Sequence, residues 1–335
     1  MKKLLLLCAI AATATMGYVS ASYADDRDPN SLNIEYLYWK AEQSGITYGV
    51  SPDALTLTPP APNTTVLRQN FGWNSGFRLG AAHEFACTDF DLSLQWTRFN
   101  DNRTTTPREE VIIATELLGV LNDVIVGGTL NGGVISSQWK LDFNMFDLNL
   151  GSTLIRNPYY SINSYIGVKG GWVNQKQKIT YTNFINTTTA ETVTAQVDET
   201  NKFYGIGPKL GVAMRYTIGS GFHFIGDFAA AILYGNSKNP VTQNVEQPTG
   251  TLLADSTISF QHNRMQPTTQ MKLGLDWEQN FFTCYDIKIG ICYEMQYFWN
   301  TWRNQNSYIQ DIYVTDAGYS DLFLQGVTVQ ASIGF

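Results

Sequence analysis

Residues 285–297 read Tyr-Asp-Ile-Lys-Ile-Gly-Ile-Cys-Tyr-Glu-Met-Gln-Tyr, and every second residue is apolar. The odd positions carry Tyr, Ile or Met, whereas the even positions carry Asp, Lys, Gly, Cys, Glu and Gln. Because successive side chains of a strand point to opposite faces, this stretch predicts a β-strand with one apolar and one polar face. Such a strand can cross a membrane with lipid on one side and a polar lumen on the other.

The same alternation recurs along the chain. It is clear in two further segments, 204–216 and 269–278, and weaker in 32–38, 77–81, 90–96, 162–172, 222–234 and 322–335. Segment 139–151 also alternates, but its apolar positions change from odd to even after Met145, which we interpret as a β-bulge. Together with 285–297, these segments make ten strands. We therefore predict an all-β, transmembrane, antiparallel up-and-down barrel of about ten strands, or up to fourteen if 66–71 and 190–197 add more.

The composition fits an exported barrel. The 335 residues are 44% hydrophobic but only 15% charged, and no window after the N-terminus has the run of about 18 apolar residues that a membrane helix needs. The net charge of −7 and the lack of a Lys/Arg run argue against a nucleic-acid partner. A secreted β-sandwich is the alternative fold. Its outer face would be polar, whereas here one face of each strand is apolar and has Tyr and Trp at its ends.

The first 24 residues predict a cleaved signal peptide. Lys2 and Lys3 form its charged start, 4–14 its apolar segment, and Ser22-Tyr23-Ala24 a small-x-small cleavage site. We therefore predict export to the outer membrane of a Gram-negative cell, with one barrel domain over 25–335.

The connections between the predicted strands alternate in length. Four are short, namely 86–88, 152–158, 218–221 and 279–284. The others are long and rich in Thr, Asn and Pro, namely 42–73, 100–138, 183–202, 236–265 and 299–320. Since such barrels have short periplasmic turns and long external loops, we expect both termini in the periplasm.

Three stretches resemble the major outer membrane protein family of Legionella and Chlamydia-type bacteria. They are Ile-Glu-Tyr-Leu-Tyr-Trp-Lys-Ala (34–41), Tyr-Ile-Gly-Val-Lys-Gly-Gly-Trp (165–172) and Phe-Tyr-Gly-Ile-Gly-Pro-Lys-Leu-Gly (203–211). Segments 139–150 and 229–235 continue the likeness, which covers most of the barrel and leaves the loops unmatched. The resemblance implies an abundant porin, often a homo-oligomer, that passes small solutes. The terminal Phe335 resembles the signal that the outer-membrane insertion machinery reads.

The polar face of the strands predicts the lumen wall. It carries charges of both signs, which predicts weak cation preference at most, because strong ion selection needs a ring of one sign. The predicted pore-lining residues are Glu35, Arg78, Asp89, Asp91, Lys140, Asp142, Lys169, Lys209, Arg215, Asp227, Lys272, Asp276, Asp286, Lys288 and Glu294. Asp147 and Glu278 share this face. The alternative is that these charges pair with one another as a structural network.

One long loop carries a helix signal. Thr106-Pro107-Arg108-Glu109 has the residues of a capping box, and apolar residues follow at spacings of three and four until Gly127-Gly128. We predict a helix over 107–126 that folds into the outer mouth of the barrel and narrows the pore. The alternative is a helix across the loop tops. Its predicted contacts are Ile113, Leu117 and Leu121 on the helix, and Leu37, Trp39, Leu233, Phe298 and Leu324 on the strands.

Three of the four cysteines follow the signal peptide: Cys87, Cys284 and Cys292. Cys87 and Cys284 fall in predicted periplasmic turns, an oxidising compartment in which disulfides form. Cys292 is too far along its strand from Cys284 to pair with it. The resemblance to chlamydial proteins implies a disulfide or cross-links to periplasmic envelope proteins through Cys87 and Cys284. Free thiols are the state that we expect.

No pattern points to catalysis. The three histidines, His83, His223 and His262, have no nucleophile motif beside them, and we find no metal-ligand spacing, phosphate loop or dinucleotide fingerprint. We therefore predict a porin that is not an enzyme and that needs no cofactor or metal. The alternative is a surface adhesin or structural envelope barrel with a plugged pore.

Overall fold

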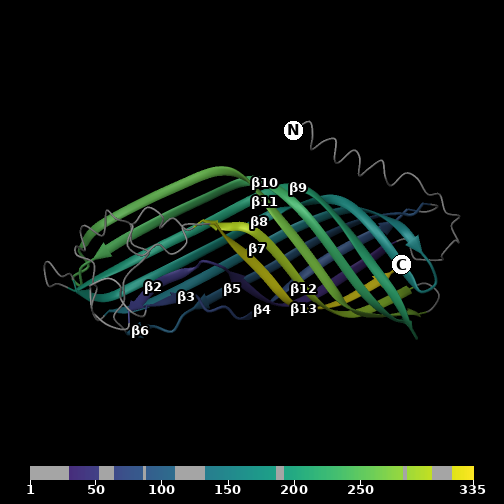
Figure 1. The fold of residues 1–335 in the computed structure, drawn as a ribbon, viewed down its shortest axis with the longest axis horizontal. Coiled ribbons are helices and arrows are strands. Elements are labelled where there is room, and N and C mark those ends of the chain that lie inside the picture. Colours follow the sequence, from purple (N-terminus) through teal and green to yellow (C-terminus); the bar gives the residue numbers. More distant parts are fainter. Residues whose placement is uncertain are drawn as a thin grey trace.

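The computed structural model describes residues 30–52, 64–85, 88–109, 133–185, 192–281, 285–303 and 319–335. These residues form a β structure (Figure 1). Its strands are β1 (Asn30–Gln43), β2 (Thr47–Pro52), β3 (Thr64–Arg68), β4 (Trp73–Glu84), β5 (Phe90–Thr104), β6 (Arg108–Glu109), β7 (Val134–Arg156), β8 (Tyr160–Ile185), β9 (Thr192–Gly219), β10 (Phe222–Glu246), β11 (Leu252–Phe281), β12 (Tyr285–Arg303) and β13 (Tyr319–Gly334).

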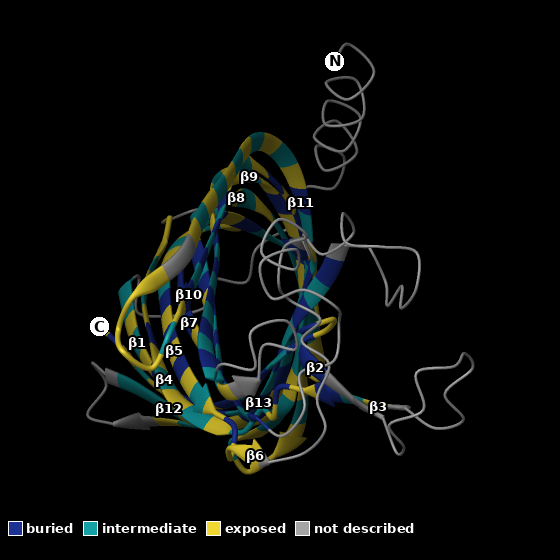
Figure 2. Ribbon diagram, turned by 90° about the vertical axis from the view of Figure 1, so that its left-hand side faces the viewer, coloured by how far each residue is buried: buried dark blue, intermediate teal, exposed yellow. Residues whose placement is uncertain are grey.

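Ten antiparallel strands form the wall of a closed barrel. Each pairs with its neighbour in the order β5-β4-β1-β13-β12-β11-β10-β9-β8-β7, and β7 pairs back with β5. Figure 2 shows the ring from one end, with the buried faces of the strands turned inward. Short β6 is added at one end of β7, and β2 and β3 form a separate hairpin. The predicted ten-stranded barrel is confirmed, and 66–71 and 190–197 add no further wall strands.

The wall is much taller on one side. β8, β9, β10 and β11 have 26, 28, 25 and 30 residues, whereas about 9–11 tilted residues suffice to cross a bilayer. The prediction of long loops over 183–202 and 236–265 was therefore wrong, because most of these residues continue the strands. Their outward side chains are polar, such as Asp198 and Thr242, so the strands continue beyond the lipid-facing wall on the side opposite the short turns. We assign this side to the cell exterior and call this part of the barrel the extracellular extension.

The predicted β-bulge after Met145 was also wrong. β7 stays in unbroken register with β5 from Gln138 to Ser152, and its odd residues face the lumen throughout. The apolar positions change because the environment changes. Around Trp139 to Met145 the lumen is apolar, whereas from Phe146 onward the outer surface is apolar.

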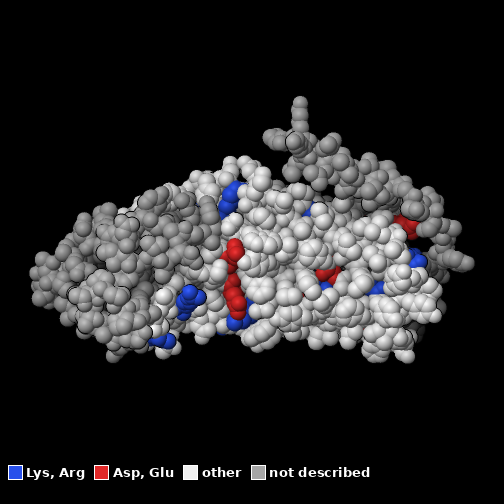
Figure 3. All heavy atoms as spheres, viewed as in Figure 1, with Lys and Arg blue, Asp and Glu red and all other residues white. Residues whose placement is uncertain are grey.

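The outer surface of the barrel carries the apolar residues that a lipid-facing wall needs. Ile34, Leu148, Leu210 and Ile291 expose 57%, 45%, 61% and 56% of their surface although their strands are fully paired. Outward aromatic rings contact one another along the wall, as Tyr38 and Trp73 do at 5.4 Å. On the face seen in Figure 3, charged atoms are sparse outside one band near its middle. Within the described ranges there is no helix of the length and hydropathy that a membrane crossing requires.

The barrel lumen as candidate functional site

The lumen holds a buried cluster of charges from β4, β1, β12 and β11. Arg78 on β4 donates to Glu35 Oε2 on β1 and to Glu294 Oε1 on β12, both at 2.7 Å. Its Nε also donates to Thr97 Oγ1 at 2.8 Å. Lys272 Nζ lies 3.1 Å from Glu35. Burying a charge is tolerated only when its partners are complete, and here each carboxylate has at least two basic or amide partners.

A second cluster lies on the neighbouring wall. Asp147 on β7 accepts from Lys209 Nζ at 2.8 Å and from Lys169 Nζ at 3.2 Å. The Lys209 ammonium also lies 5.4 Å from the centre of the Tyr165 ring, and the Tyr165 hydroxyl donates to Asp227 at 3.0 Å. Gly211, opposite Tyr165 in the register, leaves the space that this ring fills. The lumen wall is thus held by side chains from four consecutive strands.

A cavity of about 410 Å³ lies between these clusters and the strand ends that carry the short turns. Near those ends, Arg215 pairs with Asp276 at 3.0 Å and with Glu278 at 2.5 Å, and Lys288 lies 3.3 Å from Glu278. The cavity is lined by side chains of both charges, among them Arg78, Asp91, Lys209, Asp227, Lys272 and Lys288. It is a water-accessible, charge-lined vestibule on the side that we assign to the periplasm.

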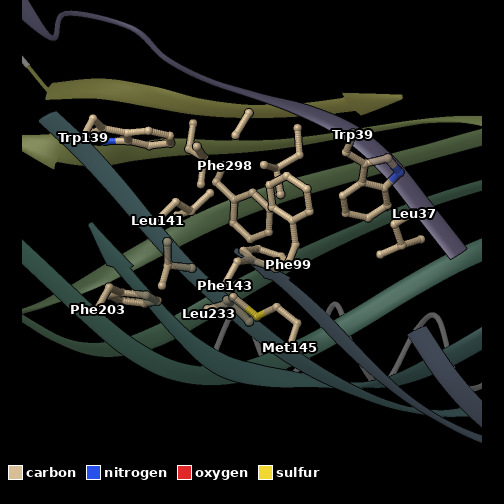
Figure 4. Packing of buried hydrophobic residues seen from close by; sticks show 14 of the residues in the cluster. Leu37, Trp39, Phe99, Trp139, Leu141, Phe143, Met145, Phe203, Leu233 and Phe298 are labelled. Atoms are coloured by element: carbon tan, nitrogen blue, oxygen red, sulfur yellow. The ribbon is translucent and has the colours of Figure 1, made fainter. Parts of the chain in front are cut away.

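Beyond the charges, an apolar layer fills the lumen (Figure 4). Figure 4 shows rings and aliphatic chains from several strands pointing toward one another. Phe143 and Phe298 meet edge to face at 5.4 Å, and Trp39 contacts Phe99 at 5.8 Å. The layer consists of Leu37, Trp39, Ala41, Ile46, Phe99, Trp139, Leu141, Phe143, Met145, Val173, Phe203, Leu233, Phe298, Leu322 and Leu324, all at most 3% exposed.

The strand residues expected to contact a mouth helix belong to this layer. Leu37, Trp39, Leu233, Phe298 and Leu324 pack with its other members. Their contact with a helix over 107–126 stays a prediction, because most of that segment lies outside the described residues.

Only the start of the segment predicted as a helix is described, and it is not helical. Arg108 and Glu109 form β6 and pair with Ile135 and Val134 of β7. The other predicted helix residues, including Ile113, Leu117 and Leu121, lie outside the described residues.

On the extracellular side of the apolar layer, the lumen contains a group of hydrogen-bonded polar side chains and then a second apolar cluster. Gln43 Oε1 accepts from Gln175 Nε2 and from Thr301 Oγ1, both at 2.9 Å, which links three strands across the lumen. Farther out, the β2–β3 hairpin folds inward against the extracellular extension, where the Tyr181 hydroxyl donates to Tyr48 O at 3.0 Å. This outer cluster comprises Tyr48, Leu67, Ile135, Ile179, Tyr181, Val193, Ala195, Val197, Val241 and Val245.

Most predicted pore-lining residues lie on the lumen face. By register these are Glu35, Arg78, Asp91, Lys169, Lys209, Arg215, Asp227, Lys272, Asp276, Asp286, Lys288 and Glu294. Lys140 and Asp142 were assigned wrongly. They occupy even positions of β7, opposite Lys176 and Asn174, and face outward. Asp89 lies exposed in the turn before β5 and faces no lumen.

Phe99 and Phe143, whose rings lie in the lumen, were not among the predicted site residues. The available signal was strand phase, because Phe99 continues the inward series that contains Gln95 and Thr97.

Of the remaining predicted residues, Cys292 is a buried free thiol that faces the lumen. Cys87 and Cys284 lie outside the described residues. Phe335 ends the chain beside Asn30, with which it exchanges two backbone hydrogen bonds of 2.9 and 3.2 Å.

Solved structures of outer-membrane proteins are similar to this chain at low identity. The outer membrane protease OmpT from Escherichia coli shares 10% identity over 94% of this chain and 98% of its own, with a TM-score of 0.40. The Pseudomonas putida toluene transporter TodX shares 8% identity over 93% and 90% of the two chains, with a TM-score of 0.31. A major outer membrane protein from Thermus thermophilus shares 11% identity over 90% and 98%, with a TM-score of 0.27.

At such identities the likeness concerns the barrel fold alone. No curated protein matches the sequence. The family model that describes the Legionella pneumophila major outer membrane protein precursor matches residues 24–335. The match covers every described strand and agrees with an outer-membrane barrel. The chain therefore belongs to the Legionella major outer membrane protein family.

Proposed function

We propose that this outer-membrane barrel is a porin for small hydrophilic solutes and ions, and that its apolar layer keeps the lumen closed at rest. The observation that carries the proposal is the charge-lined vestibule of about 410 Å³, which leads from the turn end of the barrel to Arg78. A polar wall with both signs of charge suits solutes that keep part of their hydration shell. Such a wall favours neither cations nor anions strongly, since either kind of ion is attracted by some of its charges and repelled by others.

The apolar layer supports closure at rest. A hydrophobic constriction excludes water, and ions cannot pass where water is absent. Phe143 and Phe298 meet across the layer, and both are at most 1% exposed. Opening therefore requires these side chains to separate, and we expect rare or small conductance steps from the wild-type barrel.

A second candidate function is favoured by the same layer. If the packing of Phe143 and Phe298 never loosens, the barrel is a structural or adhesive envelope protein, and its extracellular extension is the surface that meets other molecules. The lumen also favours a role other than catalysis. His223 faces the lumen and lies 2.9 Å from Asp276, and Asp276 also pairs with Arg215. This histidine is therefore part of the ion pairs at the turn end of the barrel.

Planar-bilayer recordings of the refolded protein separate the two candidates. We expect the double variant Phe143→Ala/Phe298→Ala to conduct more often and in larger steps than wild type, because it removes two rings from the constriction. Phe146→Ala is the matched control, since it removes a ring from the outer face of the same strand. With folded and inserted protein, silence of both wild type and the double variant would overturn the porin proposal.

A further inference from the structure

Basic side chains gather on the outer surface of β5 and β7–β10. We call Arg98, Lys140, Lys176, Lys202 and Lys238 the outer-rim cations. All of them lie on the outward face by register, and all are exposed. They lie on adjacent strands, so they form one patch of the barrel wall.

The patch contains like charges in direct opposition. Lys140 lies opposite Lys176, and Lys202 lies opposite Lys238. Like charges facing each other across antiparallel strands destabilise the pair. Lys176 has an ion pair with Asp198 at 3.2 Å, whereas Lys140, Lys202 and Lys238 have none among the described residues. This arrangement of unpaired ammonium groups favours the binding of an anion that is not part of the protein.

The position of the patch identifies the source of that anion. On the membrane side of each cation, two to six residues away along the same strand, lies an outward aromatic residue. These residues are Trp96, Phe146, Trp172, Tyr204 and Tyr234. The first three contact one another in a row, with ring centres 6.0 Å apart at each step. Aromatic rows of this kind mark the membrane–water interface of outer-membrane barrels. The outer-rim cations therefore lie at the level of the lipid headgroups.

The surface is also shaped to receive a group. A shallow hollow of about 560 Å³ is lined by Arg98, Lys140, Lys176 and Lys202, together with the amides of Asn100 and Asn174. Two acidic residues also line the hollow, and both have partners within the chain. Asp101 pairs with Arg103 at 2.8 Å, and Asp142 accepts hydrogen bonds from Asn144 and Asn174 at 2.8 and 3.4 Å. Guanidinium, ammonium and amide donors around one hollow suit a phosphate group.

We propose that the outer-rim cations bind the phosphorylated headgroup of a lipid in the outer leaflet, whose acyl chains run along the aromatic row beneath. A lipid, rather than free phosphate, fits because the hollow borders the apolar wall. The site lies outside the lumen, so the proposal is independent of whether the barrel conducts.

The test is a titration of the refolded full barrel in uncharged detergent with diphosphorylated lipid A as the probe. The double variant Lys140→Gln/Lys202→Gln, in which both residues line the hollow, should bind about 30-fold more weakly, since each basic residue near such a surface contributes about 1 kcal/mol. Lys140→Arg/Lys202→Arg should restore binding, which separates loss of charge from loss of fold. Lys40→Gln is the matched control, because Lys40 is an outward lysine on β1 that already pairs with Glu42.

Three results would overturn the proposal. The first is equal affinity of the wild type and the Lys→Gln variant. The second is equal affinity for the same glycolipid after removal of its phosphates, which would show that the acyl chains alone bind. The third is displacement of the lipid by millimolar inorganic phosphate, which would make the patch a general anion site.

Discussion

At the scale of single residues, Arg78 decides whether the centre of the lumen is stable. Its guanidinium satisfies Glu35 and Glu294 on two other strands, and all three side chains are at most 4% exposed. Removing one member of such a group leaves buried charge without a partner, which costs more than the group contributes when intact.

We expect Arg78→Gln to lower the free energy of unfolding by about 3–5 kcal/mol, because two carboxylates lose their main partner. Urea unfolding in detergent measures the change. The double variant Arg78→Gln/Glu294→Gln should recover much of the loss, since the Glu294 charge goes as well and Glu35 keeps Lys272 as its partner. Arg98→Gln, an exposed outward arginine, should change stability by no more than about 0.5 kcal/mol. A small effect of Arg78→Gln alone would show that the cluster is hydrated.

Gly211 is a second residue with a specific steric task. A Cβ at this position would overlap the Tyr165 ring, whose hydroxyl donates to Asp227. We expect Gly211→Ala to destabilise the barrel by about 1–3 kcal/mol, the usual cost of overpacking. Gly226→Ala is the comparison, because its Cβ would meet only the flexible ends of Leu273 and Met214 on the outer face. Equal melting temperatures for the two variants would contradict this assignment.

At the scale of elements, the sequence predicted the strands whose apolar face is turned outward to lipid. It did not predict the parts of strands whose apolar face is turned inward and whose polar face is turned outward. Strands such as 285–297 were recognisable because lipid and a charged lumen impose opposite compositions on the two faces. In 192–199 the inward residues are Val193, Ala195 and Val197 and the outward ones are polar, as in a water-soluble sheet. Apolar and polar residues alternate there too. Which of the two faces points outward, however, depends on what surrounds the strand, and this is decided by the tertiary structure.

The site was predictable to the same extent. The charges of the lumen followed from strand phase, whereas their partners on other strands did not, because Arg78 and Glu294 are 216 residues apart in sequence. Lys140 and Asp142 were misassigned since they lie in the half of β7 where the polarity is inverted. Of the apolar layer, Leu37, Trp39, Leu233, Phe298 and Leu324 were expected on the inward face, whereas Phe99 and Phe143 were not recognised as part of it.

The segment predicted as a mouth helix can be tested as an element. With the apolar layer in place, we expect deletion of 110–126 to leave the conductance of the barrel low, because the constriction lies on the strands. Adding the deletion to Phe143→Ala/Phe298→Ala should leave the larger steps of that variant unchanged. A deletion that by itself opens the barrel would instead make this loop the constriction, as the sequence analysis proposed.

At the scale of the whole molecule, the barrel consists of a membrane part and an extracellular extension with its own core. The extension buries the outer cluster around Tyr181 and Val197, to which the β2–β3 hairpin contributes Tyr48 and Leu67. The strands of the extension continue those of the membrane part, so both parts share one hydrogen-bonded sheet. The side chains that pack inside the extension, however, do not depend on lipid.

Tyr181→Ala should therefore loosen the extension without unfolding the membrane part. The side chain is fully buried, and its hydroxyl donates to the hairpin backbone. We expect amide exchange at 192–199 to become faster while exchange at 204–216 stays the same, since local openings follow packing units. Thr180→Ala, an outward neighbour, should change neither region. Uniform acceleration along β9 would show that the two parts unfold together.

The inverted polarity of β7 has a consequence for assembly. A strand with a regular two-residue pattern can slide by two residues against its neighbours and still place every apolar side chain correctly. β7 cannot, because the same slide would move Asp147 into the position of Met145, among aromatic rings, or Met145 into the position of Asp147, beside two ammonium groups. Its sequence thus specifies the depth at which the strand comes to rest as well as the face that it presents.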